Sequence, residues 1–217
     1  MLTPQKVQTV LRILDKKFPH PKPTLNFKSP FEFLVAVVLA AQCTDVRVNK
    51  VTPNLFPHYN TPQKLLQLGE DRLRDIIHST GYHRQKSKHL ILCARALVEK
   101  HKSIVPKTME ELIALPGIGR KSASAILAQA YNIPAFPVDT HIFRVTNRLG
   151  LVHEKTPQKT EFALLKTIPK NRWIEFHMQL IAHGRTTCKA PRPKCGECPI
   201  KNICQWPGKK EQLAAKK

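Results

Sequence analysis

The stretch Leu115-Pro116-Gly117-Ile118-Gly119-Arg120-Lys121 separates two segments of helical pattern and decides how this chain folds. Residues 108–115 begin with the capping box Thr108-Met109-Glu110-Glu111, which indicates a helix start. Residues 120–131 place apolar side chains at helical spacing, so a second helix follows at once. Two helices joined by a short turn with two glycines form a helix-hairpin-helix motif.

The turn of this hairpin has the composition of a phosphate-binding loop. Gly117 and Gly119 would let the turn adopt positive φ and let a phosphate approach the backbone. Free N–H groups at the start of the second helix would point at the phosphate. They would fix the register of the DNA backbone on the protein without recognising the base sequence. An ordinary helix–helix corner is the alternative, since Pro and Gly are common there. The charge of the chain favours phosphate binding.

Helix-start signals recur outward from the hairpin. The tetrapeptide Thr-Pro-Gln-Lys occurs at residues 3–6, 61–64 and 156–159, each time with a capping hydroxyl before a proline at the first helical position. Further helical segments are predicted at residues 31–41, 44–56, 61–68, 71–79, 84–101, 108–115, 120–131, 140–149, 157–167 and 172–183. Sustained two-residue alternation is absent, so the fold class is predicted to be all-α. The β-branched stretch Val35–Val38 is the place where a strand would be least surprising.

The chain is strongly basic. Its 217 residues include 36 Lys and Arg against 15 Asp and Glu, a formal net charge of +21. An excess of this size indicates a polyanionic partner, with nucleic acid as the leading candidate and an acidic membrane as the rival. The longest nearly apolar run, residues 31–41, is too short to span a bilayer, and no lipidation motif stands out. Since no secretion signal is visible, we expect an intracellular protein, in the cytoplasm or nucleoid, that contacts DNA and no membrane.

Two residues near the hairpin are candidates for catalysis. Lys121 lies in the first turn of the second helix, where the helix dipole and partial burial would favour the neutral amine, the form that attacks carbon. Asp139 precedes the helical segment at residues 140–149, and by position alone a capping role explains it. A solvated surface charge is the corresponding alternative for Lys121. The combination of lysine, carboxylate and hairpin favours catalysis.

Four of the six cysteines crowd into 17 residues, at Cys188, Cys195, Cys198 and Cys204. This clustering favours a metal site over disulfides, because the protein is expected to be intracellular. The remaining two, Cys43 and Cys93, lie in apolar helical segments where buried free thiols are common. Spacing alone leaves tetrahedral zinc and an iron–sulfur cluster open, since both accept four thiolates.

The sequence resembles the helix-hairpin-helix DNA glycosylases, most closely the endonuclease III group, over essentially the entire chain. The resemblance rests on residues 115–121, on Val138–Val145 and on the cysteine array. It implies a bifunctional DNA glycosylase and AP lyase of base excision repair that acts on damaged bases, with oxidised pyrimidines as the implied class. In that family, the lysine matching Lys121 attacks the sugar C1′ of a flipped-out nucleotide and releases the base. The resulting Schiff base cleaves the strand 3′ to the abasic site by β-elimination, and the aspartate matching Asp139 assists attack and stabilises positive charge on the sugar.

The resemblance also implies how DNA and metal are bound. Gln42 matches the glutamine that fills the gap left by the flipped nucleotide. Tyr82 stands where the family usually has an apolar wedge, typically leucine, and an aromatic side chain can stack between bases. The cysteine spacing is similar to the family's [4Fe–4S] loop, expected at residues 188–204 as a structural staple. The remaining expected DNA contacts are Gly117, Gly119, His141, Lys189 and Arg192.

The implied architecture is two all-α lobes flanking a DNA-binding cleft. Residues 22–133 would form a six-helix barrel lobe that carries the helix-hairpin-helix at about 108–131. Residues 1–21 and 134–217 would form the cluster-bearing lobe, so that Lys121 would face Asp139 across the cleft. The expected partner is double-stranded DNA that contains damaged bases or abasic sites, bound by a monomer.

Two alternatives remain beside this interpretation. The adenine-removing branch of related glycosylases also carries the hairpin and the cluster, but its members typically lack the lysine and have an extra C-terminal domain. This chain has Lys121, and about a dozen residues follow Cys204. A non-catalytic DNA-binding module would keep the charge, the hairpin and the cysteines but would not need Lys121 and Asp139 together. Incubation with an abasic-site duplex separates these classes.

Overall fold

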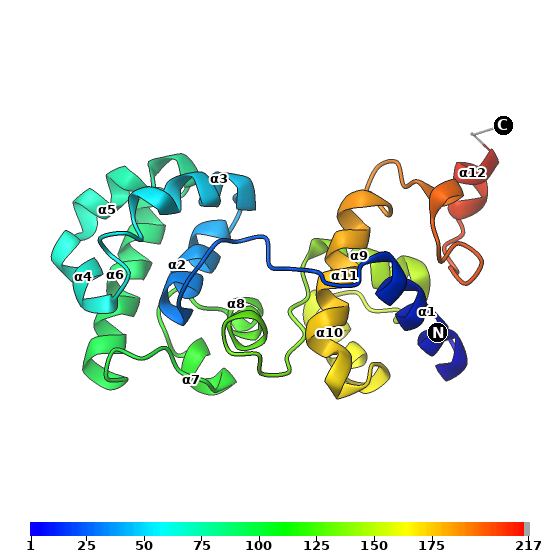
Figure 1. The fold of residues 1–217 in the computed structure, drawn as a ribbon, viewed down its shortest axis with the longest axis horizontal. Coiled ribbons are helices and arrows are strands. Elements are labelled where there is room, and N and C mark those ends of the chain that lie inside the picture. Colours follow the sequence, from blue (N-terminus) through cyan, green and yellow to red (C-terminus); the bar gives the residue numbers. More distant parts are fainter. Residues whose placement is uncertain (215–217) are drawn as a thin grey trace. The chain divides into compact units, whose positions relative to one another are not determined.

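The computed structural model describes residues 1–214, and these contain helices and no strand. The all-α prediction is therefore confirmed, and the Val35–Val38 stretch lies within a helix. The helices divide between two compact units (Figure 1). The contiguous unit is Pro23–Ile133, and the split unit joins Met1–Lys22 to the chain from Pro134 onward. Within residues 1–214, none of the helices has both the length and the hydropathy that crossing a bilayer requires.

The contiguous unit is built around one buried helix, α2. Its elements are α2 (Pro30–Ala40), α3 (Asp45–Val51), the 3₁₀ turn η1 (Thr52–Asn54), α4 (Pro62–Leu68), α5 (Glu70–Ile76), the 3₁₀ turn η2 (His78–Thr80), α6 (His83–Lys100), α7 (Met109–Ile113), α8 (Arg120–Ala125) and the π-helical turn η3 (Ile126–Ala130). Apolar residues occupy nearly every position of α2, as expected for a helix covered on all sides. It contacts α3, α6, α8 and η3, while α6 also packs against α4 and α5.

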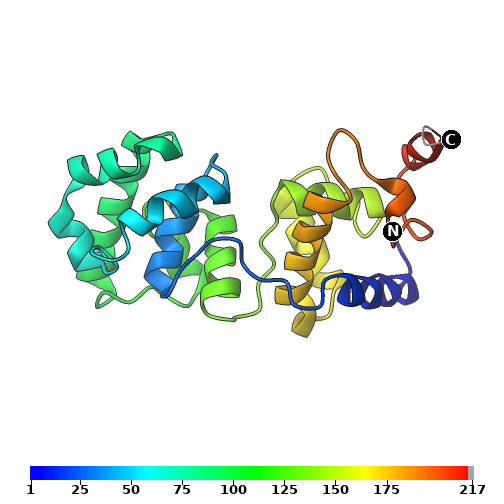
Figure 2. The same ribbon diagram turned by 45° about the horizontal axis from the view of Figure 1, so that its top comes forward.

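The split unit brings the first helix onto the last third of the chain. Its elements are α1 (Pro4–Lys17), α9 (Thr140–Leu149), α10 (Pro157–Thr167), the 3₁₀ turn η4 (Lys170–Arg172), α11 (Trp173–Thr186), the 3₁₀ turn η5 (Cys195–Glu197) and α12 (Lys209–Ala214). The apolar face of α1 enters one core with residues of α9 and α11 such as Ile142 and Phe176. Figure 2 shows α1, in blue, beside these later helices.

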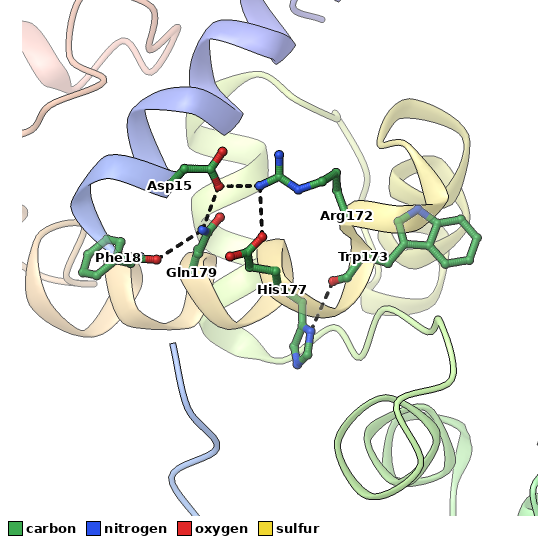
Figure 3. A network of polar contacts seen from close by, with 7 residues as sticks. Asp15, Phe18, Arg172, Trp173, His177 and Gln179 are labelled. Carbon is green, nitrogen blue, oxygen red and sulfur yellow. Dashed lines mark hydrogen bonds and ion pairs between the residues drawn. The ribbon is translucent and has the colours of Figure 1, made fainter. Parts of the chain in front are cut away.

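A polar network fastens α1 to the later helices (Figure 3). Oδ1 of Asp15 accepts hydrogen bonds from Nε2 of Gln179 at 3.0 Å and from the Arg172 guanidinium. Gln179 also donates to the Phe18 carbonyl oxygen at 3.2 Å. Burial acts to raise the pKa of Asp15, but the hydrogen bonds from Gln179 and Arg172 and the guanidinium charge outweigh it and lower that pKa. The stabilisation that the charged Asp15 carboxylate gives the fold is therefore fully present above the usual pKa of an aspartate. It is lost as the pH falls through the lowered pKa of Asp15.

The three Thr-Pro-Gln-Lys tetrapeptides begin helices as predicted. The hydroxyls of Thr3, Thr61 and Thr156 accept hydrogen bonds from the backbone N–H three residues later, at 3.4, 3.3 and 3.2 Å. A proline follows each cap at the start of the helix, where its missing N–H leaves no acceptor unsatisfied. Each cap of this kind typically contributes about 1 kcal/mol. The tetrapeptide therefore fixes where α1, α4 and α10 begin.

Three predicted helices change type before their ends. The segment predicted at 71–79 is α-helical to Ile76 and ends in the 3₁₀ turn η2. The segment predicted at 44–56 is α-helical only to Val51 and continues as η1, since that turn contains a proline that cannot donate to the α-helical ladder. The segment predicted at 120–131 is α-helical to Ala125, and η3 then widens into a π-turn. No feature of the sequence predicts the π-turn. Such turns are often found next to functional sites.

Candidate active site and metal centre

The hairpin turn requires glycine at Gly117. Its φ is +80°, and a Cβ there would lie 2.8 Å from the Cβ of His89. Gly119 instead has φ −91° and ψ 172°, an extended conformation, and is the N-cap of α8. The expectation that both glycines supply positive φ is therefore wrong for Gly119. Apart from atoms of its chain neighbours, no atom lies within 4 Å of a Cβ placed on Gly119, so the space at the start of α8 is open.

Lys121 is the second residue of α8, in the contiguous unit, and its side chain is exposed. Two effects were expected to favour its neutral amine, the helix end and partial burial. The placement at the helix start is found, whereas the burial is not. The side chain is therefore open to solvent at the start of α8.

Asp139 is the N-cap of α9, in the split unit. Its Oδ1 accepts a hydrogen bond from the Ile142 N–H at 2.8 Å, as its position in the sequence predicts. The residue is half-buried. Burial lowers the pKa of His141, two residues later, more than the charge of Asp139 raises it. His141 therefore presents a neutral imidazole beside the carboxylate at neutral pH.

Two arginines of α9 hold the segment that follows α11. Arg144 donates to the Cys188 carbonyl oxygen from Nε at 3.1 Å and from Nη2 at 2.9 Å. Arg148 donates to the carbonyl oxygens of Lys189 and Ala190, both at 2.8 Å. Neither arginine was predicted to act at a site. Their spacing of four residues, which places both on one face of α9, is the signal that would have found them.

The four clustered cysteines, Cys188, Cys195, Cys198 and Cys204, line one pocket of the split unit. Val145, Leu149 and Ile200 contribute apolar walls to it. All four thiols are free and none is fully exposed. Burial raises the pKa of Cys198 to about 11 and also raises the pKa of Cys195. Residues 1–214 contain no group of three or more His, Cys, Asp or Glu side chains placed around a single metal ion.

Nitrogen atoms approach two of the four sulfurs. Nη1 of Arg148 lies 3.7 Å from Sγ of Cys188, and Nε2 of His183 lies 3.8 Å from Sγ of Cys198. Burial lowers the pKa of His183 to about 4, so its ring is neutral at pH 7. Thiols gathered in one pocket with apolar walls and nitrogen donors fit a thiolate-bound metal cluster, because the metal would supply the positive charge that buried thiolates need.

Gln42 and Tyr82 share a left-handed backbone conformation, with φ of +52° and +49°. Gln42 lies in a turn closed by a hydrogen bond of 3.1 Å from the Cys43 N–H to the Ala40 carbonyl oxygen. Ala41, at φ −59° and ψ 116°, makes this a type II turn, in which the position of Gln42 favours glycine. The Tyr82 side chain is 62% exposed. Such conformations cost about 1–3 kcal/mol each and concentrate at functional sites.

Lys189 and Arg192 are exposed in the segment that joins Cys188 to Cys195. The bond from Arg148 fixes the backbone at Lys189, so this basic tip of the pocket is anchored at its base. The tip therefore presents positive charge on an ordered support.

Comparisons with known proteins identify the chain. Residues 35–170 match the model of the HhH-GPD superfamily base excision DNA repair proteins. The hairpin and this match define the class, a helix-hairpin-helix repair protein. The chain is also 45% identical over 202 residues to Endonuclease III of Haemophilus influenzae. This match covers 93% of this chain and 96% of that protein. It therefore belongs to the endonuclease III family.

Two solved structures match the whole fold. One is a non-covalent Endonuclease III–DNA complex, with a TM-score of 0.92 and 39% identity over 99% of this chain and 100% of that one. The other is a trapped Endonuclease III–DNA covalent intermediate with an estranged adenine, with a TM-score of 0.92 and 39% identity over 98% of this chain and 100% of that one. The predicted function is thereby confirmed: the chain is a bifunctional DNA glycosylase and AP lyase of base excision repair.

Proposed function

We propose that the chain removes oxidised pyrimidines from double-stranded DNA, as an intracellular monomer, with Lys121 as nucleophile and Asp139 as its carboxylate partner. The observation that carries the proposal is the exposed lysine at the start of the second hairpin helix. A nucleophile in that position lies next to the backbone that would hold a phosphate of the damaged strand.

The covalent step uses the neutral amine of Lys121. Nζ attacks C1′ of the damaged nucleotide, the C1′–N bond breaks, and its electron pair leaves with the base, which takes up a proton. Opening of the sugar ring gives the Schiff base. Loss of a C2′ proton then expels the 3′ phosphate and cleaves the strand. Asp139 assists the attack and stabilises the positive charge that develops on the sugar.

Access to C1′ requires the nucleotide to leave the helix stack. In the proposal, Tyr82 wedges between bases and Gln42 fills the space that the nucleotide leaves. The backbone at Gly117 and Gly119 binds a phosphate. His141 and the tip residues Lys189 and Arg192 add the remaining DNA contacts. The left-handed backbone of Gln42 and Tyr82, which Lys102, Ser103 and Asn132 also adopt, is consistent with this assignment, because such conformations are concentrated at functional sites.

We further propose that Cys188, Cys195, Cys198 and Cys204 hold a [4Fe–4S] cluster as thiolates. When bound, the cluster supplies structural cross-linking and no step of the base-excision chemistry. Arg148 and His183 would then donate hydrogen bonds to two of the ligand sulfurs. The cluster would cross-link both ends of the basic tip, at Cys188 and Cys195, to the later residues Cys198 and Cys204.

The purified protein should contain about four iron atoms per chain and show the broad visible absorbance of an iron–sulfur protein. Cys198→Ser should lose most of that iron and lower the unfolding temperature, while the half-exposed Cys43, which lies outside the pocket, serves as control in Cys43→Ser. Metal analysis and thermal unfolding measure both. Stoichiometric zinc without iron would contradict the cluster assignment.

A panel of duplexes should distinguish the proposed substrate class. Duplexes with an oxidised pyrimidine or an abasic site should be nicked and, with borohydride present, covalently joined to the protein, whereas undamaged duplex should only be bound. Gel analysis of labelled strands reports both products. Binding without nicking on every duplex would favour a non-catalytic DNA-binding module. Removal of adenine without trapping would favour the adenine-removing branch.

A further inference from the structure

Lys86, on α6, is a buried cation that the mechanism above does not use. Only 5% of the residue is exposed, although lysine is almost always at the surface. Its Nζ donates two hydrogen bonds of 2.8 Å, one to the Leu39 carbonyl oxygen and one to the Thr80 carbonyl oxygen. Burial lowers the pKa of Lys86, whereas the nearby Cys43 thiol acts in the opposite direction. Both acceptors are neutral backbone groups.

The two carbonyls belong to the ends of two different elements. Leu39 lies in the last turn of α2, and Thr80 is the last residue of η2. Carbonyls at helix ends lack a partner within the helix and carry partial negative charge, so they are suited to a buried ammonium. Lys86 therefore joins the end of α2 to the end of η2 through one side chain.

Each of these elements leads directly into one of the proposed flipping residues. Gln42 follows Leu39 by three residues, and Tyr82 follows Thr80 by two. Both flipping residues have positive φ, a backbone conformation that residues other than glycine adopt rarely. The chain therefore turns sharply at each of them. The backbone N–H of Lys86 also makes the first hydrogen bond of α6, to the Tyr82 carbonyl oxygen at 2.9 Å.

We propose that Lys86 is a positioning residue that holds the Gln42 and Tyr82 loops at a fixed separation, so that both side chains enter DNA at the same base-pair step. The inference rests on the proposed roles of Gln42 and Tyr82. An apolar side chain of similar length would avoid the desolvation of a charge, but it would leave the Leu39 and Thr80 carbonyls without this donor and the two loop ends without their shared link. The Lys86 amine reaches both loop ends.

The test compares substrates that need base-pair opening with substrates that do not. Lys86→Met removes the ammonium and keeps the length of the side chain, and Lys88→Met, on the exposed side of the same helix, is the matched control for loss of charge. Single-turnover excision of an oxidised pyrimidine from duplex DNA should slow on the order of tenfold to a hundredfold in Lys86→Met. Excision of the same lesion from single-stranded DNA should change far less, since no partner base must be displaced. Lys88→Met should match the parent on both substrates.

Two measurements keep the result interpretable if Lys86→Met folds poorly. Rates are referred to the fraction of protein that borohydride traps on a single-stranded abasic site. Lys86→Gln, which retains an N–H donor on a shorter side chain, should give a duplex rate between those of the parent and Lys86→Met. Equal slowing on duplex and single-stranded DNA would assign Lys86 a merely structural role and overturn the inference, and so would an unchanged duplex rate.

Combined variants separate this inference from the proposed function. Tyr82→Gly and Gln42→Gly remove the side chains, and glycine adopts the left-handed backbone conformation without strain. Each variant should slow excision from duplex DNA. Lys86→Met should add little to the double variant Tyr82→Gly with Gln42→Gly, because a residue that acts through these two side chains then has nothing left to position. If both glycine variants excise at the parent rate, the flipping assignment fails and this inference fails with it. If they slow excision and Lys86→Met does not, only this inference fails.

Discussion

Lys121→Gln should eliminate borohydride trapping and strand nicking while duplex binding stays close to that of the parent. The amide nitrogen of glutamine is not nucleophilic, so neither the attack on C1′ nor the Schiff base can form. The position is exposed and glutamine is a good helix former, so α8 should persist. We expect the nicking rate on an abasic duplex to fall by a factor on the order of 10³ or more.

A matched control is available in the same unit. Lys64 is exposed in the first turn of α4, and Lys64→Gln likewise removes one positive charge from the first turn of a helix. Denaturing gels after borohydride reduction measure trapping, and a binding titration at fixed salt measures affinity. Lys64→Gln should trap at the parent level. Trapping by Lys121→Gln at that level would mean that another amine is the nucleophile.

Asp139→Asn should keep the fold and lose most of the chemistry. Asn caps helices about as well as Asp, so the hydrogen bond to the Ile142 N–H can be retained. The substitution removes the negative charge that assists attack and stabilises the sugar cation, and the single-turnover rate should fall by roughly 10²–10⁴-fold. Thermal unfolding should change little, because the cap survives.

Asp139→Ala distinguishes the two roles of the same side chain. It removes both the cap and the charge, so its stability should fall by about 1 kcal/mol more than that of Asp139→Asn. Its single-turnover rate should be as low as that of Asp139→Asn. A normal rate in Asp139→Asn together with a slow rate in Asp139→Ala would show that capping, and not charge, is what the residue contributes.

The helices could be predicted from the sequence because the residues that indicate them are adjacent in the chain. A capping threonine followed by proline identifies a helix start from adjacent residues, and Thr3, Thr61 and Thr156 confirm it. The glycine-containing turn after Leu115 identified the hairpin in the same way. The all-α class followed from helical spacing without any knowledge of packing.

The contacts around the site could not be predicted because no sequence pattern links the residues that make them. The two carbonyls that Lys86 binds lie 47 and 6 residues away, and no pattern along the chain joins them. The positive φ of Gln42 and Tyr82 was missed for a related reason, since strain in a residue other than glycine is set by its surroundings. The exposure of Lys121 likewise depends on packing and contradicts the expected burial.

The split unit has a consequence for how the chain folds during its synthesis. Asp15 meets Arg172 across 157 residues, so α1 leaves the ribosome long before its partners exist. At typical rates of translation this delay is roughly 8–30 s. The contiguous unit, complete at Ile133, can fold within that interval, while the apolar face of α1 stays exposed to chaperones and proteases. The polar bonds of Asp15 in Figure 3 can therefore form only after Arg172 and Gln179 have been made, and they join the first piece of the split unit to a much later one.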